Sequence, residues 1–419
     1  MKSKLSSLAE TLTGSEIVRL GNEINERIRS GEKIFNYTIG DFDPEIFPIP
    51  PELEALIIES YRKHYTNYPP GDGVAALKTA VTEFLHRREG IDFSAEEVLI
   101  ASGGRPLIYT VFKTIVDKGD KVIYAVPSWN NNHYTHLTEG THCVIETTPE
   151  NHFMPSAGEI AGHIKDAALI CLCTPQNPTG TTLNKIELEK ICDLILAENK
   201  SRPENSKKLF LMFDQMYWTL TYGATRHYNP VSLRPEMKPY TIYIDGISKA
   251  FAATGVRVGW ALGPKEVIAK MKALLSHLGA WAPMAEQKAT AKFLQQPDWI
   301  EHFLDGFREA LEKRLVRIYE GFMNLKAKGF AVDAVAPQAA IYLTIKLDLT
   351  GKSSGEKKLE TQSDVTDYIL GHAKLAVVPF YAFGAARHSP WYRLSVGTCK
   401  LEEIPEMFAK LEASLMQLS

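Results

Sequence analysis

The sequence predicts an α/β protein whose main sheet is mostly parallel and flanked by helices, with a smaller α+β unit after it. Short apolar runs alternate with helical patterns through the middle of the 419-residue chain. Several runs are almost continuously apolar, which is typical of strands covered on both faces. After about residue 285 the pattern changes to a long helical stretch followed by strand-like runs.

Seven apolar runs predict the strands of the main sheet, and two apolar stripes predict helices that cover it. The strands are expected at residues 98–102, 121–126, 143–147, 168–174, 209–214, 241–246 and 256–262. One stripe has helical spacing through Leu107, Ile108, Val111, Phe112, Ile115 and Val116, and the other through Ile186, Leu188, Ile191, Leu194 and Ile195.

The second unit is predicted to begin with one helical stretch over residues 286–328. Strand-like runs follow at 330–335, 341–347, 375–378 and 391–396, with a polar, mobile loop expected at 351–358. We expect residues 48–287 to form a large domain, and residues 1–47 and 288–419 to form a small one.

Charge and hydropathy exclude some classes of partner. Lys and Arg total 47 against 50 for Asp and Glu, a net charge of −3, so we expect no nucleic acid partner. No apolar run approaches the roughly 18 residues of a membrane helix, so we expect no membrane partner. The N-terminus has two lysines but no apolar stretch behind them, so we expect no secretory signal.

The cysteine pattern indicates the compartment. The five cysteines are Cys143, Cys171, Cys173, Cys192 and Cys399. An odd number in a long chain favours buried free thiols, and the alternative is a disulfide or metal pair at Cys171 and Cys173. Free thiols are typical of a reducing cytoplasm, which is the location we expect.

Two patterns do not carry a function. Gly71 and Gly73 fit a relaxed dinucleotide-binding pattern, but they follow Tyr68 and two prolines rather than a strand. His133 and His136 can offer two imidazoles to a metal, but no third ligand lies nearby in the sequence. We therefore expect neither nicotinamide binding nor a metal site.

The strongest local signal is Lys249, which directly follows a predicted buried strand among small residues. Lysines avoid apolar sites unless they act there, and a lysine with a lowered pKa is a good Schiff-base nucleophile. Arg257, in a glycine-flanked turn, is a fixed cation suited to a phosphate. The alternative for Lys249 is a lysine that merely caps a loop.

Polar residues also follow two other predicted strands, where open α/β sheets bind ligands. Asp214 ends one strand and can pair with a protonated ring nitrogen, and Tyr217 can reach an oxygen on the same ring. The alternative for Asp214 is a helix N-cap. Asn177 lies in a turn stiffened by two prolines, for which a plain tight turn is the alternative.

A glycine-rich turn precedes the helix that begins near residue 107. Its residues are Gly103, Gly104 and Arg105. Glycines let a phosphate approach the backbone, and a helix N-terminus supplies amides and partial positive charge. This signal is weak by itself, because glycine turns before helices are common.

Taken in order, these segments resemble the class I/II aminotransferases, the aspartate aminotransferase superfamily of pyridoxal-phosphate (PLP) enzymes of fold type I. The resemblance rests on Asn-Pro-Thr-Gly at 177–180, Asp-x-x-Tyr at 214–217, Ser-Lys-x5-Gly-x-Arg-x-Gly at 248–259 and Arg-Leu-Ser at 393–395. It covers about residues 34–397. It implies a large domain with a mostly parallel seven-stranded sheet, and pyridoxal 5'-phosphate as cofactor.

The resemblance implies a role for each matching residue at the cofactor. Lys249 holds PLP as a Schiff base and moves the proton, Asp214 keeps the ring nitrogen protonated, and Trp129 stacks on the ring. Tyr217 and Asn177 hydrogen-bond the ring 3-oxygen. The phosphate binds Gly103, Gly104, Arg105, Ser248 and Arg257, together with Tyr68 from a second copy of the chain.

The same resemblance implies a substrate site and an assembly. Arg393 grips the substrate α-carboxylate as a bidentate pair. The backbone of Gly40 lines the substrate pocket, together with Asn177. Because Tyr68 completes the site of a neighbouring chain, we expect a homodimer with shared active sites.

Three departures from the family pattern bear on the phosphate and the substrate. Pro106 removes one backbone donor near the phosphate, and Gly246 stands where many relatives have a phosphate-binding serine. The segment 276–284 lacks the arginine that dicarboxylate-specific relatives use. We therefore hypothesise an apolar or aromatic substrate, in a pocket lined by Tyr37, Phe47, Trp281 and either Phe380 or Tyr381.

The expected function is a PLP-dependent aminotransferase that moves an amino group from an L-amino acid to a 2-oxo acid by a ping-pong mechanism. A β-lyase, decarboxylase or synthase on the same scaffold is the alternative, since these share the residues at the cofactor. A transcription regulator with this fold is disfavoured, because the first roughly 35 residues lack a helix-turn-helix pattern.

Overall fold

The main sheet of the computed structural model has seven strands, in the order β2-β8-β7-β6-β5-β3-β4. The structure describes residues 5–12, 14 and 16–419. The strands are β2 (Val98–Ala101), β3 (Lys121–Val126), β4 (Thr141–Glu146), β5 (Ala167–Cys173), β6 (Phe210–Asp214), β7 (Thr241–Gly246) and β8 (Gly259–Leu262). Only β8 runs antiparallel to its neighbours within this sheet. The predicted α/β class is confirmed, and each apolar run forms a strand within a few residues of its expected position.

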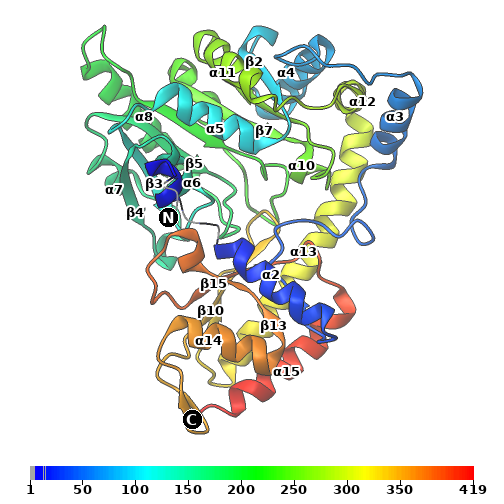
Figure 1. The fold of residues 1–419 in the computed structure, drawn as a ribbon, viewed down its shortest axis with the longest axis vertical. Coiled ribbons are helices and arrows are strands. Elements are labelled where there is room, and N and C mark those ends of the chain that lie inside the picture. Colours follow the sequence, from blue (N-terminus) through cyan, green and yellow to red (C-terminus); the bar gives the residue numbers. More distant parts are fainter. Residues whose placement is uncertain (1–4, 13, 15) are drawn as a thin grey trace.

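Helices cover both faces of this sheet (Figure 1). Side chains of α5 (Gly104–Ile115) and α11 (Lys265–Leu278) pack with one set of strand residues, which includes Leu99 and Ala101. Side chains of α4 (Ala75–Glu89), α8 (Lys185–Ser201) and α12 (Met284–Leu294) pack with the alternate set, which includes Val98 and Ile100. Successive strand residues are thus buried on opposite faces, which explains the near-continuous apolar runs.

A second, antiparallel sheet lies below the first in Figure 1, in the order β14-β15-β10-β9. Its strands are β9 (Val332–Ala334), β10 (Tyr342–Leu347), β14 (Val378–Pro379) and β15 (Trp391–Ser395). The polar segment expected as a loop forms a short hairpin, β11 (Ser353–Ser354) with β12 (Lys357–Lys358). Helices α14 (Gln362–Tyr368) and α15 (Ile404–Met416) pack in this half.

The long helix α13 (Pro297–Ala327) connects the two halves (Figure 1). Its Ile300 and Leu304 belong to the core around the main sheet, and from Phe307 onward its apolar side chains belong to the core of the second half. The single helical stretch predicted for this region is wrong, because it is broken between α12 and α13 at Gln295 and Gln296. Pro297 starts the new helix, where its missing N–H is tolerated.

The N-terminal segment packs against the second half. Strand β1 (Phe35–Asn36) pairs in parallel with β13 (Leu375–Ala376). Helix α2 (Glu16–Arg29) buries Leu20 and Ile24 in one apolar cluster with Val378 of β14. The remaining α-helices are α1 (Ser7–Thr11), α3 (Pro51–Arg62), α6 (Asn131–Leu137), α7 (Ala157–Ala161), α9 (Pro230–Leu233) and α10 (Ile247–Ala250).

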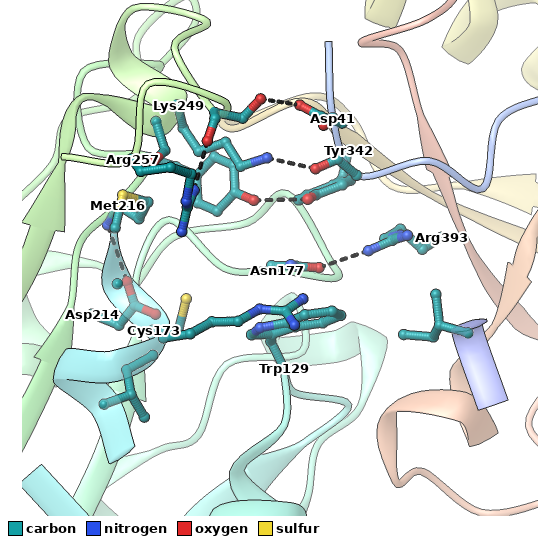
Figure 2. Close-up of a pocket in the computed structure, with 18 residues that line it drawn as sticks. Asp41, Trp129, Cys173, Asn177, Asp214, Met216, Lys249, Arg257, Tyr342 and Arg393 are labelled. Carbon is teal, nitrogen blue, oxygen red and sulfur yellow. Dashed lines mark hydrogen bonds between the residues drawn. The ribbon is translucent and has the colours of Figure 1, made fainter. Parts of the chain in front are cut away.

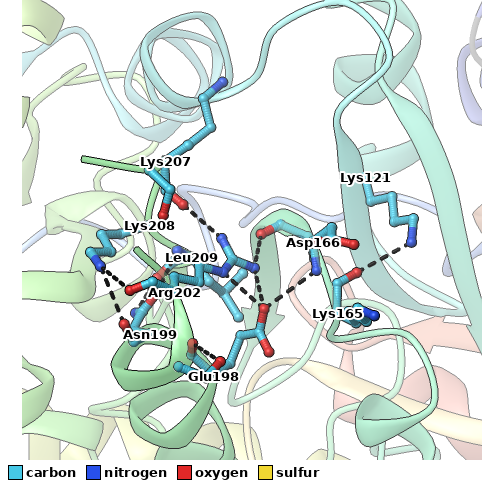
Figure 3. A network of polar contacts seen from close by, with 12 residues as sticks. Lys121, Lys165, Asp166, Glu198, Asn199, Arg202, Lys207, Lys208 and Leu209 are labelled. Carbon is cyan, nitrogen blue, oxygen red and sulfur yellow. Dashed lines mark hydrogen bonds and ion pairs between the residues drawn. The ribbon is translucent and has the colours of Figure 1, made fainter. Parts of the chain in front are cut away.

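A polar network lies at the amino-terminal ends of β3, β5 and β6, away from the strand ends that carry the predicted site (Figure 3). Lys208 Nζ donates to the carbonyls of Asn199, Arg202 and Pro203 at 3.2–3.4 Å, at the end of α8. Arg202 also donates to the Ala167 carbonyl at 2.8 Å, next to the start of β5. The network satisfies carbonyls that the end of a helix leaves without partners.

Across residues 5–12, 14 and 16–419, no helix is both long enough and apolar enough to cross a membrane.

Candidate active site

Most of the predicted site residues converge on one cleft of about 340 Å³, at the carboxyl ends of the main strands (Figure 2). Those that line it are Gly40, Gly104, Arg105, Trp129, Asn177, Asp214, Tyr217, Ser248, Lys249, Arg257 and Arg393. The lining carries four cationic groups, on Arg105, Lys249, Arg257 and Arg393, against the carboxylates of Asp41 and Asp214. A cleft of this charge favours anionic ligands.

Lys249 lies in α10, the short helix that directly follows β7. Its Nζ donates to the carbonyl of Gly40 at 2.5 Å. Burial lowers the pKa of Lys249 to about 8, and the nearby arginines add to this effect while Asp41 opposes it. At pH 7 roughly a tenth of the amine is therefore unprotonated, far more than for an exposed lysine, and the unprotonated amine is the nucleophile.

Asp214 lies at the carboxyl end of β6, where it pairs in register with Cys173 of β5. Its Oδ1 accepts a hydrogen bond from the Met216 backbone N–H at 3.1 Å, and turns rather than an α-helix follow it. The N-cap alternative is therefore wrong. Burial raises the pKa of Asp214 to about 6. A cationic partner placed in the cleft would favour its charged form.

Three closely packed glycines shape a cradle at the start of α5. Gly103 has φ +88°, and a Cβ there would lie 2.3 Å from Arg257 Nη2. A Cβ on Gly259 would lie 2.8 Å from the Gly103 backbone, and one on Gly246 would lie 2.8 Å from Gly259. The departure at Gly246 thus has a packing cause, because a serine there would collide with β8.

Arg257 is held in this cradle by backbone carbonyls. Its Nη2 donates to Ser102 at 2.7 Å and its Nη1 donates to Thr254 at 2.6 Å. Pro106 lies in the first turn of α5, where a proline is tolerated, and Gly104 begins the helix. A fixed guanidinium beside a helix N-terminus is a favourable place for a phosphate.

Arg393 is buried at the other side of the cleft, in the middle of β15. Its Nη1 donates to Asn177 Oδ1 at 3.1 Å and its Nη2 to the Thr38 carbonyl at 2.6 Å. Its guanidinium carbon lies 4.8 Å from the Tyr342 ring centroid and 4.9 Å from that of Phe383. Arg393 Nε has no partner among the described residues, so this fixed cation has donor capacity left.

Arg105 and Trp129 form a pair on the cleft wall. The guanidinium carbon of Arg105 lies 5.2 Å from the centroid of the Trp129 ring. Such stacking fixes the direction of the arginine side chain while its N–H groups stay available.

Two predicted residues, Tyr68 and Trp281, lie outside the cleft of their own chain. Tyr68 is 83% exposed, and its ring meets Trp281 edge-on at 5.6 Å. Both line a separate hollow with residues of the 61–69 and 279–286 segments. Gly103 does not line the cleft either, but it lies against the guanidinium of Arg257, which does line it. The prediction that Tyr68 acts in a second chain stays a prediction, and Trp281 does not line the cleft of its own chain.

The expected aromatic pocket is wrong for four other residues. Tyr37 and Phe47 are buried in the core of the second half, and Phe380 is buried in the cluster beneath α2. Tyr381 lines a different hollow with Glu16 and Arg387. The side chains of Tyr37, Phe47 and Phe380 complete apolar cores, which a single sequence does not distinguish from a ligand pocket.

The structure adds lining residues that the sequence analysis missed: Ile17, Asp41, Ile108, Cys173, Met216, Thr254 and Tyr342. Asp41 accepts a hydrogen bond from Thr254 Oγ1 at 2.6 Å, and Tyr342 Oη lies 2.7 Å from Tyr217 Oη. Thr254 lies inside the Lys249–Arg257 motif, so the sequence contained a signal that could have identified it as a site residue. Tyr342 lies in an apolar strand run, where a core role was the simpler interpretation.

The remaining motifs have structural roles. A Cβ on Gly73, at φ +100°, would lie 2.3 Å from Ile100, so the glycine permits a close turn against β2. His136 Nε2 lies 3.1 Å from Thr11 Oγ1. All five cysteines are free thiols, so the disulfide alternative at Cys171 and Cys173 is wrong.

Comparison with known proteins matches this geometry to one family. The family model described as aminotransferase class I and II matches residues 33–411. An aspartate aminotransferase from Bacillus sp. (strain YM-2) is 29% identical over 387 residues, covering 92% of this chain and 93% of that protein. The aspartate aminotransferase structure from Rhizobium meliloti superposes with a TM-score of 0.89 at 25% identity, over 100% of both chains. That from Thermus thermophilus with maleate has a TM-score of 0.86 at 26% identity, over 98% of this chain and 100% of that one.

Proposed function

Because the chain belongs to the class I and II aminotransferases and is a pyridoxal-phosphate-dependent transaminase, we propose that its cleft holds the cofactor through the residues described above. The phosphate binds Gly103, Gly104 and the backbone of Arg105, with Ser248 and Arg257 completing the cradle. The narrow space at Gly103 supports this placement, because a side chain there would displace Arg257. The buried amine of Lys249 supports the covalent link.

The ring contacts follow from the positions of four side chains in the cleft. Asp214 is placed to pair with the ring nitrogen and hold its proton, and a cation there offsets the burial of the carboxylate. Trp129 stacks on the ring face, and Tyr217 and Asn177 hydrogen-bond the 3-oxygen. Bound PLP supplies an electron sink for negative charge at the substrate Cα.

Lys249 and Arg393 then act on the substrate, which is an amino acid or a 2-oxo acid. Arg393 binds the α-carboxylate, for which its unpartnered Nε leaves a donor free. Lys249 moves the proton between the substrate Cα and the cofactor C4′. Its pKa of about 8 suits both roles, because the amine can give and take a proton near neutral pH.

The amino donor is an acidic amino acid, with aspartate as the leading candidate. Three of the four cations in the cleft have assigned partners: Lys249 the cofactor carbonyl, Arg257 the phosphate and Arg393 the α-carboxylate. The side chain of Arg105 remains for a second carboxylate, and this observation carries the proposal. The names of the relatives and the maleate bound by the Thermus thermophilus enzyme support it. This replaces the apolar substrate hypothesis.

A half-reaction tests the proposal. Aspartate alone should convert the bound cofactor to its amine form without release of ammonia or carbon dioxide, and release of either would support a lyase or decarboxylase instead. Arg105→Met should lower kcat/KM for aspartate about 10- to 150-fold, the value of one charged hydrogen-bonded pair, with little change for phenylalanine. Arg387→Met, outside the cleft, is the matched control. Equal losses for both substrates would contradict the role of Arg105.

We also propose a homodimer in which Tyr68 reaches the phosphate of the partner and Trp281 lies near the partner's substrate. The support is the exposure of Tyr68 beside Trp281, on a surface that also exposes Tyr61 and Leu278.

We further propose that residues 48–287 form the large domain, and that residues 1–47 and 288–419 form the small domain. The five free thiols support a reducing cytoplasm as the compartment.

A further inference from the structure

We propose that Tyr342 is a positioning residue for the cofactor: its hydroxyl donates to Tyr217 and thereby directs the proton of Tyr217 to the ring. The inference rests on the proposed function, since it takes the ring 3-oxygen to lie against Tyr217. Tyr342 comes from β10 of the second sheet, whereas Tyr217 follows β6 of the main sheet. The contact therefore joins the two halves across the cleft.

The two phenols form one hydrogen bond in a buried setting. Their oxygens are 2.7 Å apart, a normal O–H···O distance, and their rings meet edge-on with centroids 5.5 Å apart. Tyr342 is 1% exposed and Tyr217 is 4% exposed, so the protein limits their access to bulk water. Gly40 packs directly against the Tyr342 hydroxyl, since a Cβ on Gly40 would lie 2.8 Å from Tyr342 Oη.

Counting protons fixes the direction of this bond. Each phenol has one proton to donate, so one tyrosine must donate to the other and the acceptor keeps its own proton for a further partner. A Tyr217 that donated to Tyr342 would have no proton left for the ring 3-oxygen. Tyr342 is therefore the donor, and Tyr217 passes its own proton toward the ring.

Arg393 favours the same direction. Burial raises the pKa of both phenols and the guanidinium of Arg393 acts to lower both. For Tyr342, whose ring centroid lies 4.8 Å from the guanidinium carbon, Arg393 is the strongest opposing effect, whereas for Tyr217 it is the weakest of the effects on the pKa. A more acidic phenol is the better donor. A hydroxyl that accepts one hydrogen bond also donates a stronger one, by about 10–30%. The residue assigned to the substrate carboxylate and the one assigned to the ring oxygen are thus connected through Tyr342.

The proposal can be tested without measuring turnover. The quantity to measure is the midpoint pH at which the visible absorption band of the PLP-loaded enzyme changes. A donor to the 3-oxygen favours the form in which that oxygen is most negative, with the Lys249 linkage nitrogen unprotonated. Tyr217→Phe should therefore raise this midpoint by about 1 unit, and Tyr342→Phe by about 0.1–0.3 unit in the same direction. Phenylalanine at 342 keeps the ring that packs against Arg393.

Two further variants separate direct from indirect effects. The double variant Tyr217→Phe/Tyr342→Phe should match Tyr217→Phe alone, because Tyr342 acts only through Tyr217. Tyr222→Phe is the control and should leave the midpoint unchanged. It removes another buried hydroxyl, which donates to the Ala340 carbonyl. A wild-type midpoint in Tyr342→Phe, or additive shifts in the double variant, would overturn the inference. No shift in Tyr217→Phe itself would instead overturn the placement of the ring in the proposed function.

Discussion

The amine of Lys249 is buried close to Arg105, Arg257 and Arg393, with Asp41 as the opposing charge. Burial and the three cations disfavour its protonated form, so the pKa falls from its ordinary value of 10.5 to about 8. Near neutral pH this lysine therefore reacts as an amine more readily than an exposed lysine does. The arginines that bind anions in the proposed function thus also activate the nucleophile.

This pKa predicts how loading with the cofactor depends on pH. When the apoprotein is mixed with PLP, the rate at which the visible band appears should rise with pH and level off above about pH 8, because the unprotonated amine is the reactive form. A rate that still climbed steeply toward pH 10 would contradict the lowered pKa. Lys249→Ala should show no such band at any pH, which identifies the reacting group.

At the scale of single residues, the sequence predicts the functional side chains of the motifs. It does not predict the contacts that depend on tertiary packing. Lys249, Asp214 and Arg257 follow strands at recognisable spacings, so the sequence indicated them directly. Tyr342 resembles any aromatic residue of a buried strand until β10 is placed beside Tyr217. The direction of Arg105, on which the acidic substrate depends, also follows only from its stacking on Trp129.

At the scale of elements, the turn after β6 is held by a buried polar cluster behind the site, made of Glu89, His227, Gln215, Asp245 and Trp218. Gln215 donates to Glu89 Oε2 at 3.1 Å, and Trp218 donates to Asp245 Oδ2 at 2.9 Å. His227 Nε2 lies 3.5 Å from Glu89 Oε1. Gln215 and Trp218 flank Tyr217, so the end of α4 and the end of β7 both support the segment 214–218.

The cluster predicts a pH-dependent stability. Burial raises the pKa of Glu89 from 4.5 to about 8 and that of Asp245 from 3.8 to about 7. For Glu89 the stabilising contribution is complete below about pH 4.5 and is lost as pH rises through about 8, because the neutral acid is the form that suits the fold. Glu89→Gln is neutral at every pH and keeps an acceptor for Gln215.

Denaturant unfolding at pH 5 and pH 8 measures this effect. Relative to the wild type, Glu89→Gln should gain stability on going from pH 5 to pH 8, on the order of 3 kcal/mol. Glu83→Gln, on the same helix, is a control that should show no such change. A Glu89→Gln curve parallel to that of the wild type would mean that Glu89 is charged in the folded protein.

Elements were predictable where burial makes a strong pattern. The seven strands of the main sheet and the helices α5 and α8 follow from apolar runs and stripes, because all of them except the mostly exposed edge strand β4 bury apolar side chains along most of their length. The break between α12 and α13 was missed, because both helices have apolar stripes and Pro297 at a first helical turn is compatible with either interpretation. The two-residue strands β13 and β14 depend on their partners and leave little pattern.

At the scale of the whole molecule, the two halves supply different parts of the cleft. The main sheet carries Lys249, Asp214 and Arg257, and the second sheet carries Tyr342 and Arg393. The strand order of the two sheets could not be read from one sequence, since it depends on which distant segments pair. The boundary at residues 287 and 288 stays a prediction, and the side chains of α13 contribute to both cores.

The proposed homodimer predicts that two inactive variants can restore each other. Lys249→Ala lacks the nucleophile, and Tyr68→Ala lacks the contact to the phosphate of the partner. In a mixed dimer, one site combines an intact Lys249 with an intact Tyr68 from the other chain. Equal mixing after reversible dissociation should therefore recover up to about a quarter of wild-type activity, because half of the dimers are mixed and each has one complete site.

Chromatography of the two variants alone and mixed should give the same dimer peak. A mixture with no more activity than its components, at full exchange, would mean that Tyr68 acts within its own chain or not at all.

The direction of β8 determines how the covalent and ionic contacts to one ligand are spaced. After β7 the chain forms α10 and a loop and then re-enters the sheet antiparallel at Gly259, without a helical crossover to the opposite edge. Lys249 and Arg257 therefore stay at the same edge, joined by one short uninterrupted path along the backbone. An insertion or deletion between these two residues would change the reach between them, and with it the length of ligand that the site accepts.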